Sequence, residues 1–168
     1  LELAQDHLWA SQCNCPYWHG VFGGIYLNNI RYAIYKEMLL SEKFLDAVEY
    51  AYRPNWFHYE KIDYNSDGTD EVLIETRHVN LYFDGERGAG LFELDYKDVP
   101  MNLTDGMTRR EEGYHQKLSD LTKEKKSEDG RTGKSIASIH DRVLAKEKNL
   151  HEFLLYDRSV RQSFVDHF

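Results

Sequence analysis

The sequence predicts an α+β fold, with a helical N-terminal segment over residues 1–58 followed by an antiparallel β-sandwich over residues 59–168. Two observations predict this order. Up to about residue 52, apolar side chains recur every three or four positions, which is the period of an amphipathic helix. Beyond residue 70, apolar and polar side chains alternate, which is the period of half-buried strands. With 168 residues, of which 41% are hydrophobic, the chain is long enough to bury such a core.

The charge of the chain disfavours two classes of partner. Its formal charge is −8, from 29 acidic and 21 basic side chains. Proteins that follow a nucleic-acid backbone or an anionic membrane surface need an excess of Lys and Arg. The sequence also has no run of about 18 apolar residues and no secretory-type leader. We therefore expect no nucleic-acid partner, no membrane partner and a cytoplasmic location.

The helical segment has two parts. Residues 1–10 have the pattern of a helix that begins without a methionine or a capping residue, so we expect a piece of a longer protein. From Ile25 the apolar spacing predicts one long helix, or two helices with a break near Ser41. Pro54 ends this segment because a proline forces the preceding residue out of helical geometry.

The β segment follows from two alternating stretches, EVLIETRHVNLYFD and GLFELDY. Residues 84–90, DGERGAG, supply the positive-φ residues that a hairpin connection needs. Glu93 and Asp95 share one face of the second stretch, and we expect both to be solvated. Residues 119–135 are nearly devoid of apolar side chains, so we expect a flexible loop there.

The stretch DYNSDGTDEVLIE has the spacing of a calcium-binding loop, with a glycine, Gly68, at the sixth position. The candidate ligands are Asp63, Asn65, Asp67, the backbone carbonyl of Thr69, and Glu71. Position twelve is Ile74, where a helix-flanked loop has a glutamate, and a strand follows. We therefore expect a structural Ca²⁺ at the start of a strand. The alternative is an acidic turn closed by its own side chains.

The stretch WASQCNCPYWHGVFGGIYL, residues 9–27, gathers rings, cysteines and glycines. The rings of Tyr17 and Trp18 suit stacking on a sugar, and Asn14 and His19 can bond to hydroxyl groups. Tight packing against a neighbouring helix is the alternative, since glycines permit both. Cys13 and Cys15 with His19 are a possible metal site, against the alternative of two small buried thiols.

Five segments resemble glycoside hydrolase family 57, the α-amylase and 4-α-glucanotransferase group. LWASQCNCPYWHGVFGGIYLNNIR resembles the last conserved region of the catalytic domain of that family. The other segments resemble the start of the β-sandwich domain that follows it; they are DYNSDGTDEVLIETRHVNLYFD, GLFELDYKDVPMNLTDGMTRREEGYH, SIHDRVLAKE and the closing SFVDHF. The resemblance implies a galactose-mutarotase-like sandwich that is incomplete in this chain.

The resemblance also implies where the chemistry lies. In the family, the nucleophilic glutamate and the acid aspartate lie on an incomplete (β/α) barrel upstream of this region, and nothing in this chain matches them. Retaining glycosidases need two carboxyl groups about 5 Å apart. We therefore expect no catalytic residue here, an inactive chain when alone, and two partners: the upstream barrel of the same parent protein, and an α-glucan or maltooligosaccharide.

One family position differs in this chain. The family has an aspartate between the asparagine and the aromatic pair, and Cys15 stands there in this sequence. A thiol cannot accept two sugar hydroxyls as a carboxylate does. By resemblance, Trp18 is the best candidate for a wall of the active site, with Asn14, Cys15, Tyr17 and His19 beside it.

Two other functions are compatible with the same residues. One is a non-catalytic, calcium-stabilised carbohydrate-binding sandwich that presents Trp18 and Tyr17 as a platform. The other is a purely structural module. The leading interpretation is a fragment of an α-glucan-active enzyme that contributes the edge of the cleft and a β-sandwich.

Overall fold

The computed structural model describes residues 1–19, 22–113, 115–116 and 150–165. The predicted loop at 119–135 lies outside these residues. Two compact units divide the chain, one of residues 1–107 with 161–168, the other of residues 108–160. The division predicted between residues 58 and 59 stays a prediction.

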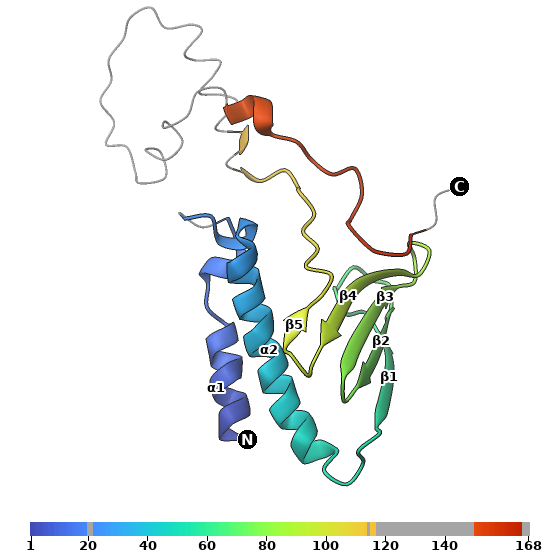
Figure 1. Ribbon diagram of the computed structural model, residues 1–168. Coiled ribbons are helices and arrows are strands. Elements are labelled where there is room, and N and C mark those ends of the chain that lie inside the picture. Colours follow the sequence, from blue (N-terminus) through green and yellow to red (C-terminus); the bar gives the residue numbers. More distant parts are fainter. Residues whose placement is uncertain (20–21, 114, 117–149, 166–168) are drawn as a thin grey trace, which may run out of the picture. The chain divides into compact units, whose positions relative to one another are not determined.

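Two helices lie side by side in the first unit (Figure 1). They are α1, Glu2–Ser11, and α2, Asn28–Glu49. The helix α2 is continuous through Ser41, whose hydroxyl donates a hydrogen bond to the carbonyl oxygen of Ala4 at 2.7 Å. His7 and Glu37 form a second link between the helices at 2.7 Å. Of the two predicted arrangements, the single long helix is therefore the one that forms.

A five-stranded antiparallel sheet follows, with its strands in chain order. The strands are β1, Phe57–Ile62; β2, Glu71–Thr76; β3, Val79–Asp84; β4, Gly90–Tyr96; and β5, Met101–Asn102. The predicted hairpin at 84–90 joins β3 to β4, and a register shift next to Tyr82 bulges this pair. The α+β class is confirmed. The described residues hold one sheet of the expected sandwich.

The polar face of the sheet is the more buried one. Asn80, Tyr82 and Asp84 are the buried residues of β3, and Asp95 and Lys97 are buried in and just after β4. Side chains of the opposite face are mainly apolar and half-buried, including Val72, Ile74, Leu81, Phe83, Leu94 and Tyr96. The helix α2 contributes hydrogen-bond partners to the polar face, through Glu42 to Asn80 and through Tyr35 to Glu93. Polar contacts therefore join α2 to the sheet.

The C-terminal segment of the first unit returns to the sheet. Leu91 and Ser163 exchange backbone hydrogen bonds at 2.9 and 2.8 Å. The amide of Gln162 donates to Asp84 at 2.7 Å. These bonds extend the edge of the β3–β4 hairpin.

The described part of the second unit holds a short 3-10 helix, Leu150–Phe153. Arg109 and Asp157 form a bidentate ion pair with a closest distance of 2.6 Å. His115 is buried and lies 3.0 Å from the Tyr156 hydroxyl. Among the described helices, none is both long and apolar enough to cross a bilayer. The cytoplasmic location stays a prediction.

Candidate functional site

The loop between α1 and α2 is closed by a contact of its two short 3-10 helices, Cys15–Tyr17 and Gly24–Tyr26. The amide of Ile25 donates to the carbonyl oxygen of Trp18 at 2.8 Å. Gly24 has a φ of +48°, and a Cβ at this position would lie 2.1 Å from the same carbonyl oxygen. Only a glycine allows this approach. The glycine therefore fixes the backbone that carries the candidate rings.

The candidate rings are accessible and not enclosed in an apolar interior. Tyr17 is 54% exposed, and its hydroxyl donates to the carbonyl oxygen of Ser11 at 2.6 Å. Trp18 and His19 are half-buried and meet edge to face, with ring centroids 4.7 Å apart. An indole held at its edge by an imidazole keeps a defined orientation. The structure thus brings Trp18 and His19 together and turns the Tyr17 hydroxyl toward the end of α1.

The remaining candidates of this loop, Asn14 and Cys15, are exposed next to the rings in the chain. Both Cys13 and Cys15 are free, exposed thiols, so the alternative of two buried thiols is wrong. Pro16, which follows Cys15, is the buried residue of its 3-10 helix. Within the described residues, no three His, Cys, Asp or Glu side chains are arranged to hold a metal ion.

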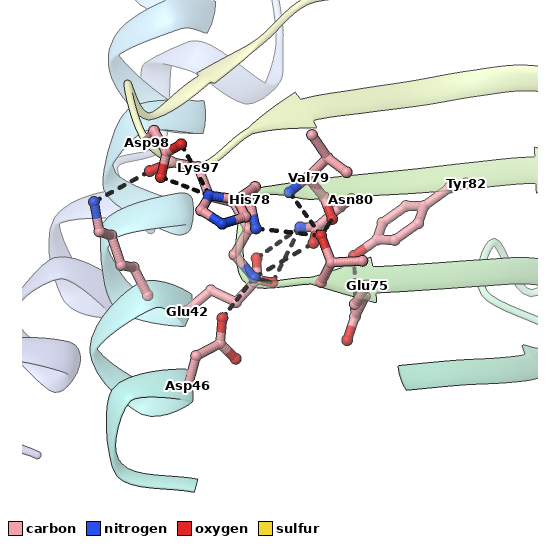
Figure 2. Close-up of polar contacts among 11 residues, drawn as sticks. Glu42, Asp46, Glu75, His78, Val79, Asn80, Tyr82, Lys97 and Asp98 are labelled. Atoms are coloured by element: carbon pink, nitrogen blue, oxygen red, sulfur yellow. Dashed lines mark hydrogen bonds and ion pairs between the residues drawn. The ribbon is translucent and has the colours of Figure 1, made fainter. Parts of the chain in front are cut away.

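A buried charged cluster joins α2 to the sheet, and sequence reasoning missed it. The ammonium of Lys97 donates to Glu42 at 2.6 Å and to Asp46 at 2.5 Å. The side-chain amide of Asn80 donates to both carboxylate oxygens of Glu42 at 3.0 Å. Figure 2 shows the Lys97, Glu42 and Asn80 side chains converging, with Asp46 one helical turn farther along α2. These contacts link residues that are up to 55 positions apart.

The pKa values in this cluster follow from burial and charge. Burial raises the pKa of Asp46 above its usual value, in spite of the ammonium of Lys97. Burial lowers the pKa of Lys97, but the carboxylates of Glu42 and Asp46 raise it by more. Lys97 therefore keeps its charge. Its ammonium nitrogen also lies 5.0 Å from the centroid of the Trp56 ring, a cation–π contact.

Asp95 is buried and Glu93 is half-buried, and both are hydrogen-bonded, so the expectation that they are solvated is wrong. Asp95 is 1% exposed and accepts a hydrogen bond from Asn102 at 2.9 Å. Glu93 accepts a hydrogen bond from the Tyr35 hydroxyl of α2 at 3.3 Å. Burial and the charge of Asp95 raise the pKa of Glu93 to about 8, and burial raises the pKa of Asp95 as well. The pair holds a proton at neutral pH and serves the contact of helix and sheet.

The predicted calcium loop is closed by its own hydrogen bonds. Asp63 accepts from the amides of Asp67 and Gly68 at 3.0 and 3.1 Å. Glu71 is 1% exposed and accepts from the amide of Tyr64 and the side chain of Asn65.

A further bond within this loop joins Asp67 to the hydroxyl of Thr69 at 2.5 Å, and hydrogen bonds from Thr69 hold the pKa of Asp67 below its usual value. These hydrogen bonds form the acidic turn of the alternative interpretation. Each carboxylate oxygen keeps a second lone pair for a cation, so the calcium ion stays a prediction.

The chain matches two known families of protein domains. Residues 2–45 match "Alpha-amylase/4-alpha-glucanotransferase, middle domain". Residues 63–168 match "Alpha-amylase/4-alpha-glucanotransferase, C-terminal". The candidate rings lie in the first match, and the acidic turn and β2 to β5 lie in the second.

Named relatives match almost the whole chain. The chain is 37% identical over 165 residues to alpha-amylase 1 of Dictyoglomus thermophilum. This match covers 98% of this chain and 22% of that protein. A 4-alpha-glucanotransferase of Thermococcus kodakarensis is 32% identical, covering 98% of this chain and 23% of that protein. The chain thus spans less than a quarter of the length of these relatives.

A solved structure resembles the fold. The crystal structure of 4-alpha-glucanotransferase from Thermococcus litoralis superposes with a TM-score of 0.55 at 31% identity. The match covers 67% of this chain and 16% of that one.

Proposed function

Because this chain belongs to the alpha-amylase/4-alpha-glucanotransferase family, glycoside hydrolase family 57, we propose that it forms one edge of an α-glucan-binding cleft in a longer enzyme. One observation carries the proposal. The exposed ring of Tyr17 and the half-buried rings of Trp18 and His19 lie on a loop of the matched middle domain, held in shape by Gly24. The relatives named after action on α-glucans extend well beyond this chain.

The chemistry of the loop suits a sugar. An indole offers a flat apolar face for the C–H face of a pyranose, and its neighbours offer polar edges. His19 fixes the Trp18 ring from the side and leaves its own ring half-exposed. Asn14 and Cys15 are exposed beside them for contacts with hydroxyl groups.

Bond cleavage or transfer is assigned to carboxylates on the upstream barrel of the parent protein. A retaining mechanism needs two carboxyl groups that flank the scissile bond. Two close carboxylate pairs lie in the described residues discussed above, and both are engaged: Glu42 and Asp46 bind the ammonium of Lys97, whereas Glu93 and Asp95 are hydrogen-bonded by Tyr35 and Asn102. The chain alone is therefore expected to bind glucan without hydrolysing it.

Calorimetric titration with maltotriose tests the proposal. The Trp18→Ala variant should bind about fivefold more weakly or worse, since an aromatic contact contributes about 1 kcal/mol. Trp9→Ala is the matched control because Trp9 is 60% exposed on α1. Equal affinities of the Trp18→Ala variant and the unaltered chain would remove the platform, whatever the family of the protein.

A further inference from the structure

A pocket of about 380 Å³ lies at the far end of α2 from the candidate rings. The pocket is lined by the last turns of α2, the connection to β1, and the turns after β2 and β4. Its polar and aromatic lining consists of Lys43, Asp46, Tyr50, Arg53, Trp56, Arg77 and Asp98. Its volume is within the range of small-molecule sites.

The aromatic lining of this pocket is held rigidly. Tyr50 stacks on Trp56 with ring centroids 4.1 Å apart and an angle of 12° between the rings. Lys97 holds Trp56 from the sheet side of the cluster, and Trp56 is 8% exposed. Tyr50 is half-buried, so part of its ring is open to solvent. A pre-organised aromatic surface lowers the entropic cost of binding a flat ligand face.

The rim offers both donors and acceptors. Lys43, Arg53 and Arg77 are exposed donors. Asp98 is an exposed acceptor that His78 holds at 2.9 Å, and this hydrogen bond lowers the pKa of Asp98, which is therefore ionised at neutral pH. Hydroxyl groups of a sugar donate and accept at once, so they match a rim of mixed character.

The same lining disfavours an anion. Three cationic side chains face two carboxylates in the pocket, so little net charge remains. The pocket also adjoins the C-terminal end of α2, where the aligned peptide dipoles leave a partial negative charge. This partial negative charge disfavours a phosphate but not a neutral sugar.

We propose that this pocket is a second glucan-contact site, which binds a neutral pyranose unit by stacking on Tyr50 and by hydrogen bonds to Arg77 and Asp98. The choice of ligand class rests on the proposed function. The helix α2 has 22 residues, which separates its two ends by about 33 Å. A long glucan that reaches both sites gains avidity from the second contact.

Trp56 provides a direct readout. The chain has three tryptophans, so Trp9→Phe with Trp18→Ala leaves Trp56 as the sole tryptophan and removes the first site. Maltotriose should change the emission of Trp56 in a saturable way. Adding Arg77→Gln should weaken this binding about fivefold through one lost hydrogen bond. Arg110→Gln, an exposed arginine outside the pocket, is the matched control and should change nothing.

Three results would overturn the second site: no saturable emission change, an equal affinity with Arg77→Gln, or the same emission change with inorganic phosphate. Circular dichroism checks that the tryptophan variant folds. If the tryptophan variant does not fold, calorimetry is done on the unaltered chain, which should show two maltotriose sites. Arg77→Gln should then weaken one of these sites. A single site that Arg77→Gln does not affect would count against the pocket. Failure of the Trp18→Ala test alone concerns the first site only, so the two proposals fail separately.

Discussion

The ammonium of Lys97 lies within 2.6 Å of the carboxylates of both Glu42 and Asp46, and its side chain is fully buried between α2 and the sheet. One cation thus neutralises two helix carboxylates at the contact of helix and sheet. Removing one partner of a buried ion pair is costly because the other charge stays desolvated. The contact therefore depends on Lys97 more than on any exposed ion pair of the sheet.

Lys97→Met should lower the free energy of unfolding by about 3 kcal/mol, because the methionine fills the space and leaves two carboxylates without a cation. Urea denaturation followed by circular dichroism measures this. Lys61→Met is the matched control, since the pair of Lys61 with Asp70 is exposed and 3.5 Å long. It should cost less than about 1 kcal/mol. Equal losses for the two variants would show that the cluster contributes no more than a surface pair.

Glu93 should make the chain less stable as the pH rises. Its folded pKa of about 8 lies above its ordinary value of 4.5, because burial and Asp95 disfavour the charged form. Between these two pH values the folded chain binds a proton that the unfolded chain does not. The contribution is therefore fully present below pH 4.5 and is lost by about pH 8, at up to about 1.4 kcal/mol per pH unit.

Glu93→Gln should flatten this slope, because a glutamine keeps the size and does not titrate. The free energy of unfolding is measured by urea denaturation at pH 5, 6.5 and 8. Glu86→Gln in the exposed β3–β4 turn is the control and should retain the slope of the unaltered chain. A Glu93→Gln variant with an unchanged slope would assign the proton to another group.

The alternation of β4 explains what the sequence could predict and what it could not. A period of two places Glu93 and Asp95 on one face and Leu94 and Tyr96 on the other, and the structure agrees. The pattern does not say which face a helix covers. Here α2 brings Tyr35 to the polar face, so Asp95 is buried and Glu93 is half-buried. Their partners are 7 to 58 residues away in the sequence, which no local pattern reveals.

The strand β1 was missed for a related reason. Its residues FHYEKI are exposed except for half-buried His58, so the sequence shows no alternation of buried apolar and exposed polar side chains that would indicate a strand. Pairing with β2 supplies the backbone partners that order this segment. The site loop was found because its composition is unusual, whereas the pocket at Tyr50 joins turns that are distant in the sequence.

Cys15→Asp should strengthen the binding of maltotriose. The family resemblance implies an aspartate at this position, and a carboxylate accepts two hydroxyls where a thiol accepts weakly. Cys15 is exposed, so the change should cost little stability. Cys13→Asp, which alters a second exposed thiol two residues away, is the matched control for calorimetry. Tighter binding in both variants would assign the gain to charge alone.

The calcium prediction is tested by melting. Calcium at millimolar concentration should raise the melting temperature, and a chelator should lower it, because a ligand that binds only the folded state stabilises it by mass action. Asp63→Asn should remove the response, since it removes one ligand charge from the loop. Identical melting of the unaltered chain with chelator and with calcium would leave the loop as an acidic turn held by Glu71.

Gly24 links the stability of the loop to the orientation of Trp18. A methyl group at Gly24 would lie 2.1 Å from the Trp18 carbonyl oxygen and 2.8 Å from that of Cys15, both backbone atoms. The backbone must then move, which breaks the 2.8 Å hydrogen bond from Ile25. Gly24→Ala should therefore destabilise the chain by at least about 2 kcal/mol and shift the emission of Trp18.

Gly88→Ala separates backbone strain from this close contact. Gly88 also has a positive φ, +73°, but no atom lies within 4 Å of its Cβ position. It should cost about 1 kcal/mol, the usual penalty for a left-handed alanine, and leave maltotriose binding unchanged. If Gly24→Ala weakens maltotriose binding while Gly88→Ala does not, the close approach at Gly24 is what holds the rings in place. If Gly24→Ala binds as the unaltered chain does, the rings do not depend on the loop backbone.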